Sequence, residues 1–244
     1  MICPGFCREK GMKRAFTLVE LIFVIVVIAI LAGVVAPRLQ TDSLIQARRI
    51  FIDTLRYAQH LAMVDDKYTP STDLSLYSDS VKRKKDTKFW FKKWWMFYIS
   101  SNTSHPVLVV FSDTPSANGS NQEFNNYPYY KEVANEASQN KKVMGKSFNG
   151  AADAKYVDKS LDLLDSYGIK KVVIHTPCPH NKTRLAFDEL GRPHCVQQKS
   201  SSNATPYKNI LNSVVTYTLC KDEGCEENAS VCVVARTGYI HSCN

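Results

Sequence analysis

The sequence is poor in the residues that build nucleotide-binding and hydrolytic sites. It has only 10 glycines and 6 histidines in 244 residues. It contains no glycine-rich phosphate-binding loop and no G-x-S-x-G turn for a nucleophilic serine. The histidines His60, His105, His175 and His241 are scattered and have no evident partners in the sequence. We therefore expect a protein that is not an enzyme and that uses no cofactor and no metal ion.

Charge is also absent from a long stretch near the N-terminus. Residues 21–37 carry no charged side chain, whereas Lys13 and Arg14 precede the stretch and Glu20 stands at its start. The apolar core of a signal peptide has only about 7–15 residues, so this run is too long for one. The basic residues before the run predict a cytoplasmic N-terminus. A carboxylate costs about 2.5–3.5 kcal/mol at the centre of a bilayer helix, so Glu20 is predicted to be functional.

Cysteine is missing between Cys7 and Cys178, although the chain has eight cysteines. An even, clustered set on the far side of a membrane segment predicts disulfides. We expect Cys178 to pair with Cys195, and the other four to pair among themselves. A zinc site that combines Cys178 and Cys195 with His180 and His194 is the alternative. The six candidates are Cys178, Cys195, Cys220, Cys225, Cys232 and Cys243.

The segment Phe16-Thr-Leu-Val-Glu20 and the apolar run after it resemble the processing site and N-terminal helix of type IV pilins and pseudopilins. The resemblance implies that a prepilin peptidase cuts between Ala15 and Phe16 and that the freed amine is then methylated. Ala15 departs from the family, which usually has glycine there. Phe16 and Glu20 would be the assembly residues, because Glu20 can pair with the Phe16 amine of a neighbouring subunit. Pro37 stands where the family has a proline, and we expect it to bend the helix.

Three C-terminal motifs narrow the resemblance to H-type minor pseudopilins and FimT-like minor pilins. Phe187 to Arg192, with Gly191, resembles their strand-plus-turn signature, and Val214 to Cys220 and Val231 to Gly238 resemble their two closing strands. The resemblance implies structural roles for Gly191 and Gly238. In DNA-binding members, basic residues follow the last glycine, but here the next three residues are Tyr, Ile and His.

The expected function is therefore a minor pilin or pseudopilin subunit of a type II secretion or type IV pilus-like filament. Its expected partners are other pilin subunits, prepilin peptidase, the inner-membrane assembly platform and membrane lipid. The alternative is a DNA-binding minor pilin of a natural-transformation system, and a membrane-anchored exported protein outside any filament is a third hypothesis. The expected location is the inner membrane, single-pass with a periplasmic C-terminal domain, and then the filament.

The predicted fold is α+β, with residues 1–15 as a prepilin leader. Residues 16–65 form one long helix with a transmembrane part at 16–37, and it packs on a β-rich, sandwich-like exported domain at 66–244. The second half of the helix is amphipathic, with a predicted buried face of Leu44, Phe51, Leu55, Ala58 and Ala62.

Strands and turns are expected from residue 89 onward, where segments of β-branched and aromatic residues alternate with turn signals, and the second half of the chain is β-rich. The expected strands are 89–100, 105–112, 170–176, 183–187, 213–220, 230–235 and 239–242, with a short helix at 161–164.

A basic and aromatic stretch has three interpretations. An edge strand with core aromatics and solvated lysines is favoured, ahead of a nucleic-acid patch and a membrane-surface patch. Cleavage before Phe16 leaves 27 basic and 22 acidic residues, a net charge of +5, which is too small to indicate DNA binding by itself. The stretch comprises Lys82, Arg83, Lys84, Lys85, Lys88, Lys92 and Lys93 with Phe89, Trp90, Phe91, Trp94, Trp95 and Phe97.

Asn228 lies in Glu226-Glu-Asn-Ala-Ser230, which resembles the extended N-glycosylation acceptor of some bacteria. An unmodified loop is the favoured interpretation, because such sequences also arise by chance.

Overall fold

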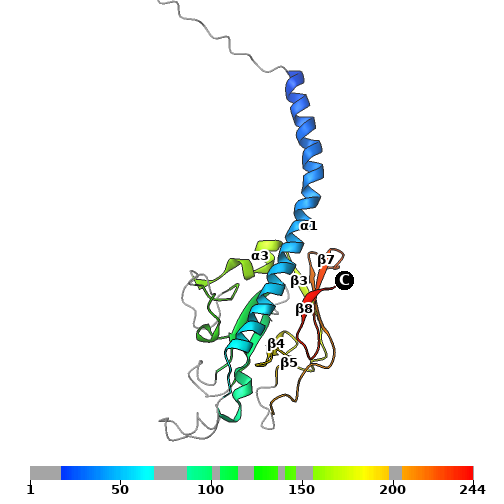
Figure 1. The fold of residues 1–244 in the computed structure, drawn as a ribbon. Helices are drawn as coiled ribbons and strands as arrows, with labels where there is room; N and C mark the ends of the chain where they lie inside the picture. The colour runs from blue at the N-terminus through cyan, green and yellow to red at the C-terminus, as the bar shows by residue number, and fades with distance from the viewer. Residues whose placement is uncertain are drawn as a thin grey trace, which may run out of the picture. The chain divides into compact units, whose positions relative to one another are not determined.

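The computed structural model describes residues 18–68, 87–100, 105–114, 124–136, 141–146, 156–197 and 205–243 (Figure 1), and only the backbone of 33–42. The expected leader and cleavage site lie outside the described residues. The chain divides into two compact units, Met1–Asp42 and Ser43–Asn244.

The first described element is the helix α1, which spans Leu18–Val64. The predicted long helix is therefore confirmed, and it ends one residue before the expected boundary. Glu20 lies in its first turn, where a negative charge complements the helix dipole. The helix continues through Pro37. Within the described part of the chain, no helix meets the length and apolarity needed to cross a membrane, and the transmembrane part at 16–37 stays a prediction.

The second half of α1 is amphipathic, as its spacing predicts. Its buried residues recur every three or four positions, which places them on one face of a helix. Arg49, Asp53 and Arg56 are exposed on other faces. Leu44 is half-buried, and the buried face comprises Ala47, Phe51, Leu55, Ala58 and Ala62, none more than 3 % exposed.

The first of two antiparallel sheets has the strand order β2-β1-β4-β5. Its strands are β1 (Trp95–Ser100), β2 (Val107–Ser112), β4 (Arg184–Phe187) and β5 (Pro193–Cys195). All residues of β2 are buried, because apolar clusters cover both faces of this sheet. A strand covered on both faces is a continuous apolar run rather than an alternating one.

The second sheet has the order β3-β6-β7-β8 and is also antiparallel. Its strands are β3 (Lys171–His175), β6 (Val215–Cys220), β7 (Asn228–Val233) and β8 (Ile240–Cys243). In β6, Val215, Tyr217 and Leu219 are buried, whereas Thr216 and Thr218 between them are half-buried. This alternation shows that one face of the second sheet packs on the core.

Three rings join α1 to both sheets. Phe51 of α1 lies 5.1 Å from Phe97 of β1 and 5.1 Å from Tyr217 of β6, measured between ring centroids. Phe97 and Tyr217 are 5.9 Å apart. Figure 1 shows the second sheet, coloured from yellow to red, beside the cyan second half of α1. The second unit is thus one core of helix and two sheets, and the α+β class is confirmed.

The strand predicted at 89–100 is wrong in its first half and in its place in the sheet. Trp90–Lys93 is a short 3₁₀ helix, η2, and the strand begins only at Trp95. β1 pairs with β2 on one side and with β4 on the other, so it is an interior strand rather than an edge. Its burial on both faces explains why it contains no charged residue.

The short helix predicted at 161–164 is wrong in its bounds, because Asp162 caps a helix that begins after it. The structure has the 3₁₀ helix η5 (Lys159–Leu161) and the helix α3 (Leu163–Tyr167) instead. The Asp162 carboxylate accepts a hydrogen bond from the Asp165 backbone and so starts α3 at Leu163. A further 3₁₀ helix, η3, spans Tyr130–Glu132. β5 was not expected, because three residues are too few to show a pattern.

Candidate functional site

The N-terminal part of α1 is a continuous apolar surface. Every large apolar side chain from Leu18 to Leu31 is at least 46 % exposed. Monomeric soluble proteins rarely expose so large a contiguous apolar surface, which usually marks a site that contacts another protein or a membrane. This segment is therefore the first candidate functional site.

Glu20 is the one carboxylate within this surface. It is exposed and lies in the first turn of α1. Ala15 and Phe16, the predicted processing residues, lie outside the described residues. The structure thus places Glu20 among apolar neighbours at the start of the helix, and the pairing with a Phe16 amine stays a prediction.

The two motif glycines meet at α1. Gly191 and Gly238 have φ values of +73° and +70°, in the left-handed region that favours glycine. The side-chain amide nitrogen of Gln59 donates to both carbonyl oxygens, at 2.7 Å to Gly191 and 3.0 Å to Gly238. The turn after β4 and the turn before β8 are therefore fixed to the same helix residue. No motif pointed to Gln59, because its partners lie more than 130 residues away in the sequence.

The turn that holds Gly191 is closed by a buried carboxylate. Asp188 is 0 % exposed. It accepts hydrogen bonds from the backbone and the Nε of Arg192, at 2.8 and 2.7 Å, and lies 2.8 Å from Nε2 of His194. Burial favours a higher pKa for Asp188, but the bonds from His194 and Arg192 outweigh it and hold the pKa below its ordinary value. Arg192 of the motif thus stabilises the turn.

The six C-terminal cysteines form three disulfides. They join Cys178 to Cys195, Cys220 to Cys225 and Cys232 to Cys243. The first is the pair that the sequence analysis expected, and the other four cysteines pair among themselves. The alternative zinc site is wrong, because Cys178 and Cys195 are oxidised and the ring of His194 faces Asp188.

The described part of the basic and aromatic stretch is largely core. Phe91 and Trp94 are 4 % and 5 % exposed, so they offer no stacking surface for nucleic-acid bases. The ammonium groups of Lys88 and Lys92 lie 5.2 and 4.7 Å from the centroid of Phe89. Core aromatics agree with the favoured interpretation, although the strand is not an edge. The remaining cluster, Lys82, Arg83, Lys84 and Lys85, lies outside the described residues.

A buried acidic pair was missed by sequence reasoning. Asp113 directly follows β2 and is 0 % exposed, and Glu132 is 6 % exposed. Burial, followed by the charge of Glu132, raises the pKa of Asp113 to about 8, although a hydrogen bond from the Asn126 backbone acts in the opposite direction. Burial also raises the pKa of Glu132. The two groups couple protonation to the packing of this region.

The predicted sequon residue Asn228 is the first residue of β7 and is exposed. Its side-chain nitrogen donates one hydrogen to the Cys225 carbonyl at 2.7 Å, and the second hydrogen of the amide is the one that a glycan would replace.

Comparison with known proteins adds one finding at the N-terminus. Residues 10–36 match the family model described as the prokaryotic N-terminal methylation motif. Searches of curated proteins and of solved structures gave no match. The matched residues contain the predicted cleavage site, Glu20 and most of the exposed apolar surface of α1. The motif supports a type IV pilin-like precursor that is processed by a prepilin peptidase.

Proposed function

We propose that the chain is a minor pilin or pseudopilin of the H-type, and that it assembles into the filament of a type II secretion or type IV pilus-like system. One observation carries this proposal: the methylation motif at residues 10–36 overlaps the first part of α1, where the apolar side chains are exposed and Glu20 is the single carboxylate among them. Such a helix needs an apolar environment before and after assembly. Lipid supplies it first, and the helices of other subunits supply it in the filament.

Processing comes first in the proposed sequence of events. Prepilin peptidase cuts between Ala15 and Phe16, and the new Phe16 amine is methylated. Alanine at position 15 has the next smallest side chain after glycine, so the peptidase accepts it. The second unit lies in the periplasm, where its three disulfides can form.

Glu20 then sets the position of the subunit in the filament. A carboxylate among apolar helices is costly unless it is paired. The Phe16 amine of a neighbouring subunit is a charge of opposite sign at nearly the same level of the helix. Pairing offsets the burial of both groups and is lost when one helix slides past the other. The role of Glu20 is therefore registry as much as affinity.

The second unit supports the H-type assignment through its turns. Gly191 and Gly238, the motif positions, both accept hydrogen bonds from Gln59 of α1. This arrangement fixes the turns of both sheets to the second half of α1. The proposed role is mechanical and non-enzymatic, and the assembly platform of the inner membrane is the partner that drives it.

The test is processing by a prepilin peptidase. The full-length chain is expressed in bacterial membranes with and without the peptidase, and its N-terminus is determined by mass spectrometry. We expect a new N-terminus at Phe16 that carries a methyl group when the peptidase is present. A variant with Phe16 and Thr17 replaced is the cleavage-site control, because it changes the predicted cleavage site and leaves the sequence of the downstream helix unchanged. An N-terminus that is unchanged by the peptidase would contradict the proposal and favour a simple membrane anchor.

A further inference from the structure

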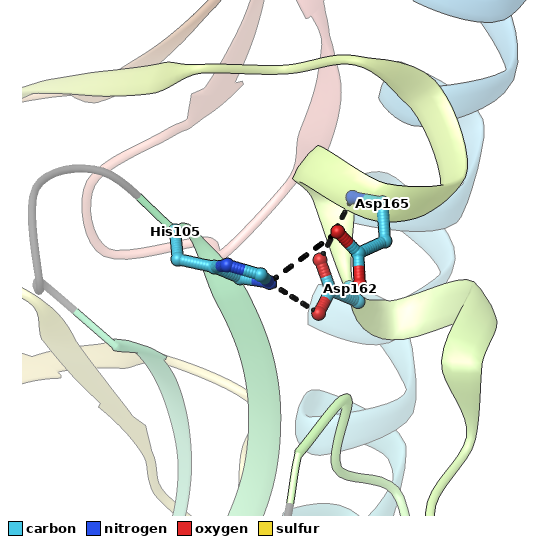
Figure 2. Close-up of side chains that lie close together, drawn as sticks. All are labelled: His105, Asp162 and Asp165. Atoms are coloured by element: carbon cyan, nitrogen blue, oxygen red, sulfur yellow. Dashed lines mark hydrogen bonds and ion pairs between the residues drawn. The ribbon is translucent and has the colours of Figure 1, made fainter.

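One imidazole and two carboxylates converge where the start of β2 meets the start of α3 (Figure 2). Nε2 of His105 lies 2.5 Å from Oδ2 of Asp162 and 3.9 Å from Oδ1 of Asp165. One ligand atom from each residue lies within 4.8 Å of the other two. We propose that these three side chains bind a single divalent transition-metal ion of the zinc type. The inference is independent of the proposed function.

The backbone holds the two contributing segments together. Val107 forms an isolated β-bridge with Asp162, and the backbone nitrogen of Leu163 donates to the Pro106 carbonyl at 3.0 Å. These contacts join segments that are 57 residues apart in the sequence. His105, two residues before the bridge, is thereby placed opposite the first turn of α3. The convergence therefore follows from the fold and does not depend on the side chains alone.

Asp162 is oriented by its second oxygen. Its Oδ1 accepts the backbone hydrogen of Asp165 at 3.0 Å, which leaves Oδ2 directed at His105. Figure 2 shows the imidazole edge facing both carboxylates. Metal sites commonly fix a ligand through a hydrogen bond to its other atom, which sets the direction of the ligating lone pair. The cap of α3 supplies this orientation for Asp162.

The three side chains differ in exposure in a way that suits ion entry. The side chain of Asp162 is 10 % exposed, whereas those of His105 and Asp165 are 40 % and 73 % exposed. The site therefore has one deep oxygen and two ligands that face solvent. A bound ion keeps positions open for water, as an ion with three protein ligands requires.

The donor set selects the type of ion. Calcium and magnesium take oxygen ligands, whereas imidazole nitrogen favours zinc and its neighbours in the transition series. Bonds of about 2.0–2.2 Å in a tetrahedral site place the donor atoms roughly 3.3 Å apart. The present separations from His105, 2.5 and 3.9 Å, lie on either side of this value. To accept the ion, His105 and Asp162 have to move slightly apart, and the exposed side chain of Asp165 has to rotate toward His105.

Binding would join the start of β2 to the start of α3 more strongly than the His105–Asp162 contact alone. An ion that binds only the folded chain raises its stability by mass action. The expected consequence is a rise in the melting temperature with zinc concentration.

The experiment uses the full-length chain in detergent, purified without a histidine tag. Cys3 and Cys7 are alkylated first, because their thiols would otherwise bind zinc. Zinc is titrated by calorimetry and thermal unfolding is followed in parallel. We expect saturation at one ion per chain, a higher melting temperature, and no effect of calcium. Asp165→Asn should weaken zinc binding by at least about tenfold, the scale on which even supporting partners act.

Asp165→Asn keeps the backbone hydrogen bond to Asp162, so it tests the ligand without removing the cap of α3. His105→Gln is the second ligand variant. His175→Gln replaces an exposed histidine of β3 outside the cluster and should bind zinc as the parent does. Two outcomes would overturn the proposal: no saturable binding by the parent chain, or equal affinity in the parent and both ligand variants.

Discussion

Gly238 packs directly on the backbone of Gly191. A Cβ atom on Gly238 would lie 2.2 Å from the Gly191 carbonyl oxygen, a distance that no side chain tolerates without movement of the backbone. Gln59 donates to the carbonyl oxygens of both residues. The two sheets therefore meet α1 at a point where a glycine is required for space as well as for its backbone angle.

We expect Gly238→Ala to destabilise the domain far more than its backbone angle alone explains. A left-handed alanine costs about 1–2 kcal/mol, and the overlap with Gly191 adds roughly 1–3 kcal/mol. Gly168→Ala is the matched control, because Gly168 has a similar φ of +72° but nothing within 4 Å of its Cβ position. Urea unfolding of the two variants measures the difference. Equal losses of stability would show that the close approach is relaxed in solution.

Gln59→Ala should lower the free energy of unfolding by about 1–3 kcal/mol, because it removes the two hydrogen bonds that the Gln59 amide donates to carbonyl oxygens. Gln46→Ala, at an exposed position on the same helix, is expected to have little effect. Both variants have similar helix propensity, so their difference in denaturant midpoint reports the two contacts. A loss equal to that of Gln46→Ala would mean that water replaces the amide at no cost.

Much of this fold could be predicted from local patterns. The amphipathic spacing of Phe51, Leu55 and Ala58 indicates the buried face of α1, and runs of β-branched residues indicate β2, β3 and β6. The cysteines indicate disulfides, since an even, clustered set that follows a predicted membrane segment is typical of exported, disulfide-bonded domains. The helix spacing and the strand composition depend on residues that are close together in the sequence, which is why a single sequence reveals them.

The contacts that fix the turns of the domain to α1 join residues far apart in the sequence, so no local pattern predicts them. Gln59 reads as an ordinary polar helix residue, and its role depends on two turns from the far end of the chain. The partner of His105 is Asp162, which is distant in the sequence. The two residues come together because the backbones of Val107 and Asp162 form an isolated β-bridge. Asp113 offers the one local signal, a carboxylate placed directly after a fully buried strand.

Asp113 makes stability fall as pH rises. Its pKa is about 8 in the folded chain, mainly because of burial, against an ordinary value near 3.8. Between these values the folded chain holds a proton that the unfolded chain has released, so each rise of one pH unit costs at most about 1.4 kcal/mol. Denaturant unfolding from pH 5 to 8 should show this slope, and Asp113→Asn should flatten it. An unchanged slope in the variant would assign the effect to other groups such as Glu132.

The disulfides should differ in their contribution. Cys178 and Cys195 are 17 residues apart, whereas Cys220 and Cys225 are 5 apart. A longer closed loop restricts the unfolded chain more, by roughly 1 kcal/mol for this pair of lengths. Replacing each pair by alanines and comparing the free energies of unfolding measures the difference. A greater loss from the shorter loop would show that native packing outweighs the restriction of the unfolded chain.

Glu20→Ala should leave membrane insertion intact and prevent assembly. The change removes a costly charge from an apolar helix, so insertion is at least as favourable as before. In the filament it leaves the Phe16 amine of the neighbour buried without a partner, which costs about 3–5 kcal/mol. The amount of subunit in sheared or cross-linked filaments, relative to the membrane fraction, should therefore fall by more than about tenfold.

The control for this variant is Asp53→Ala, which removes an exposed carboxylate from the second half of the same helix. It changes the net charge equally but leaves the apolar segment untouched, so its assembly should match that of the parent chain. Glu20→Gln separates charge from size, because it keeps the shape and loses the pairing with an amine. Filament incorporation of Glu20→Gln at the parent level would show that Glu20 acts through packing and would contradict its role in registry.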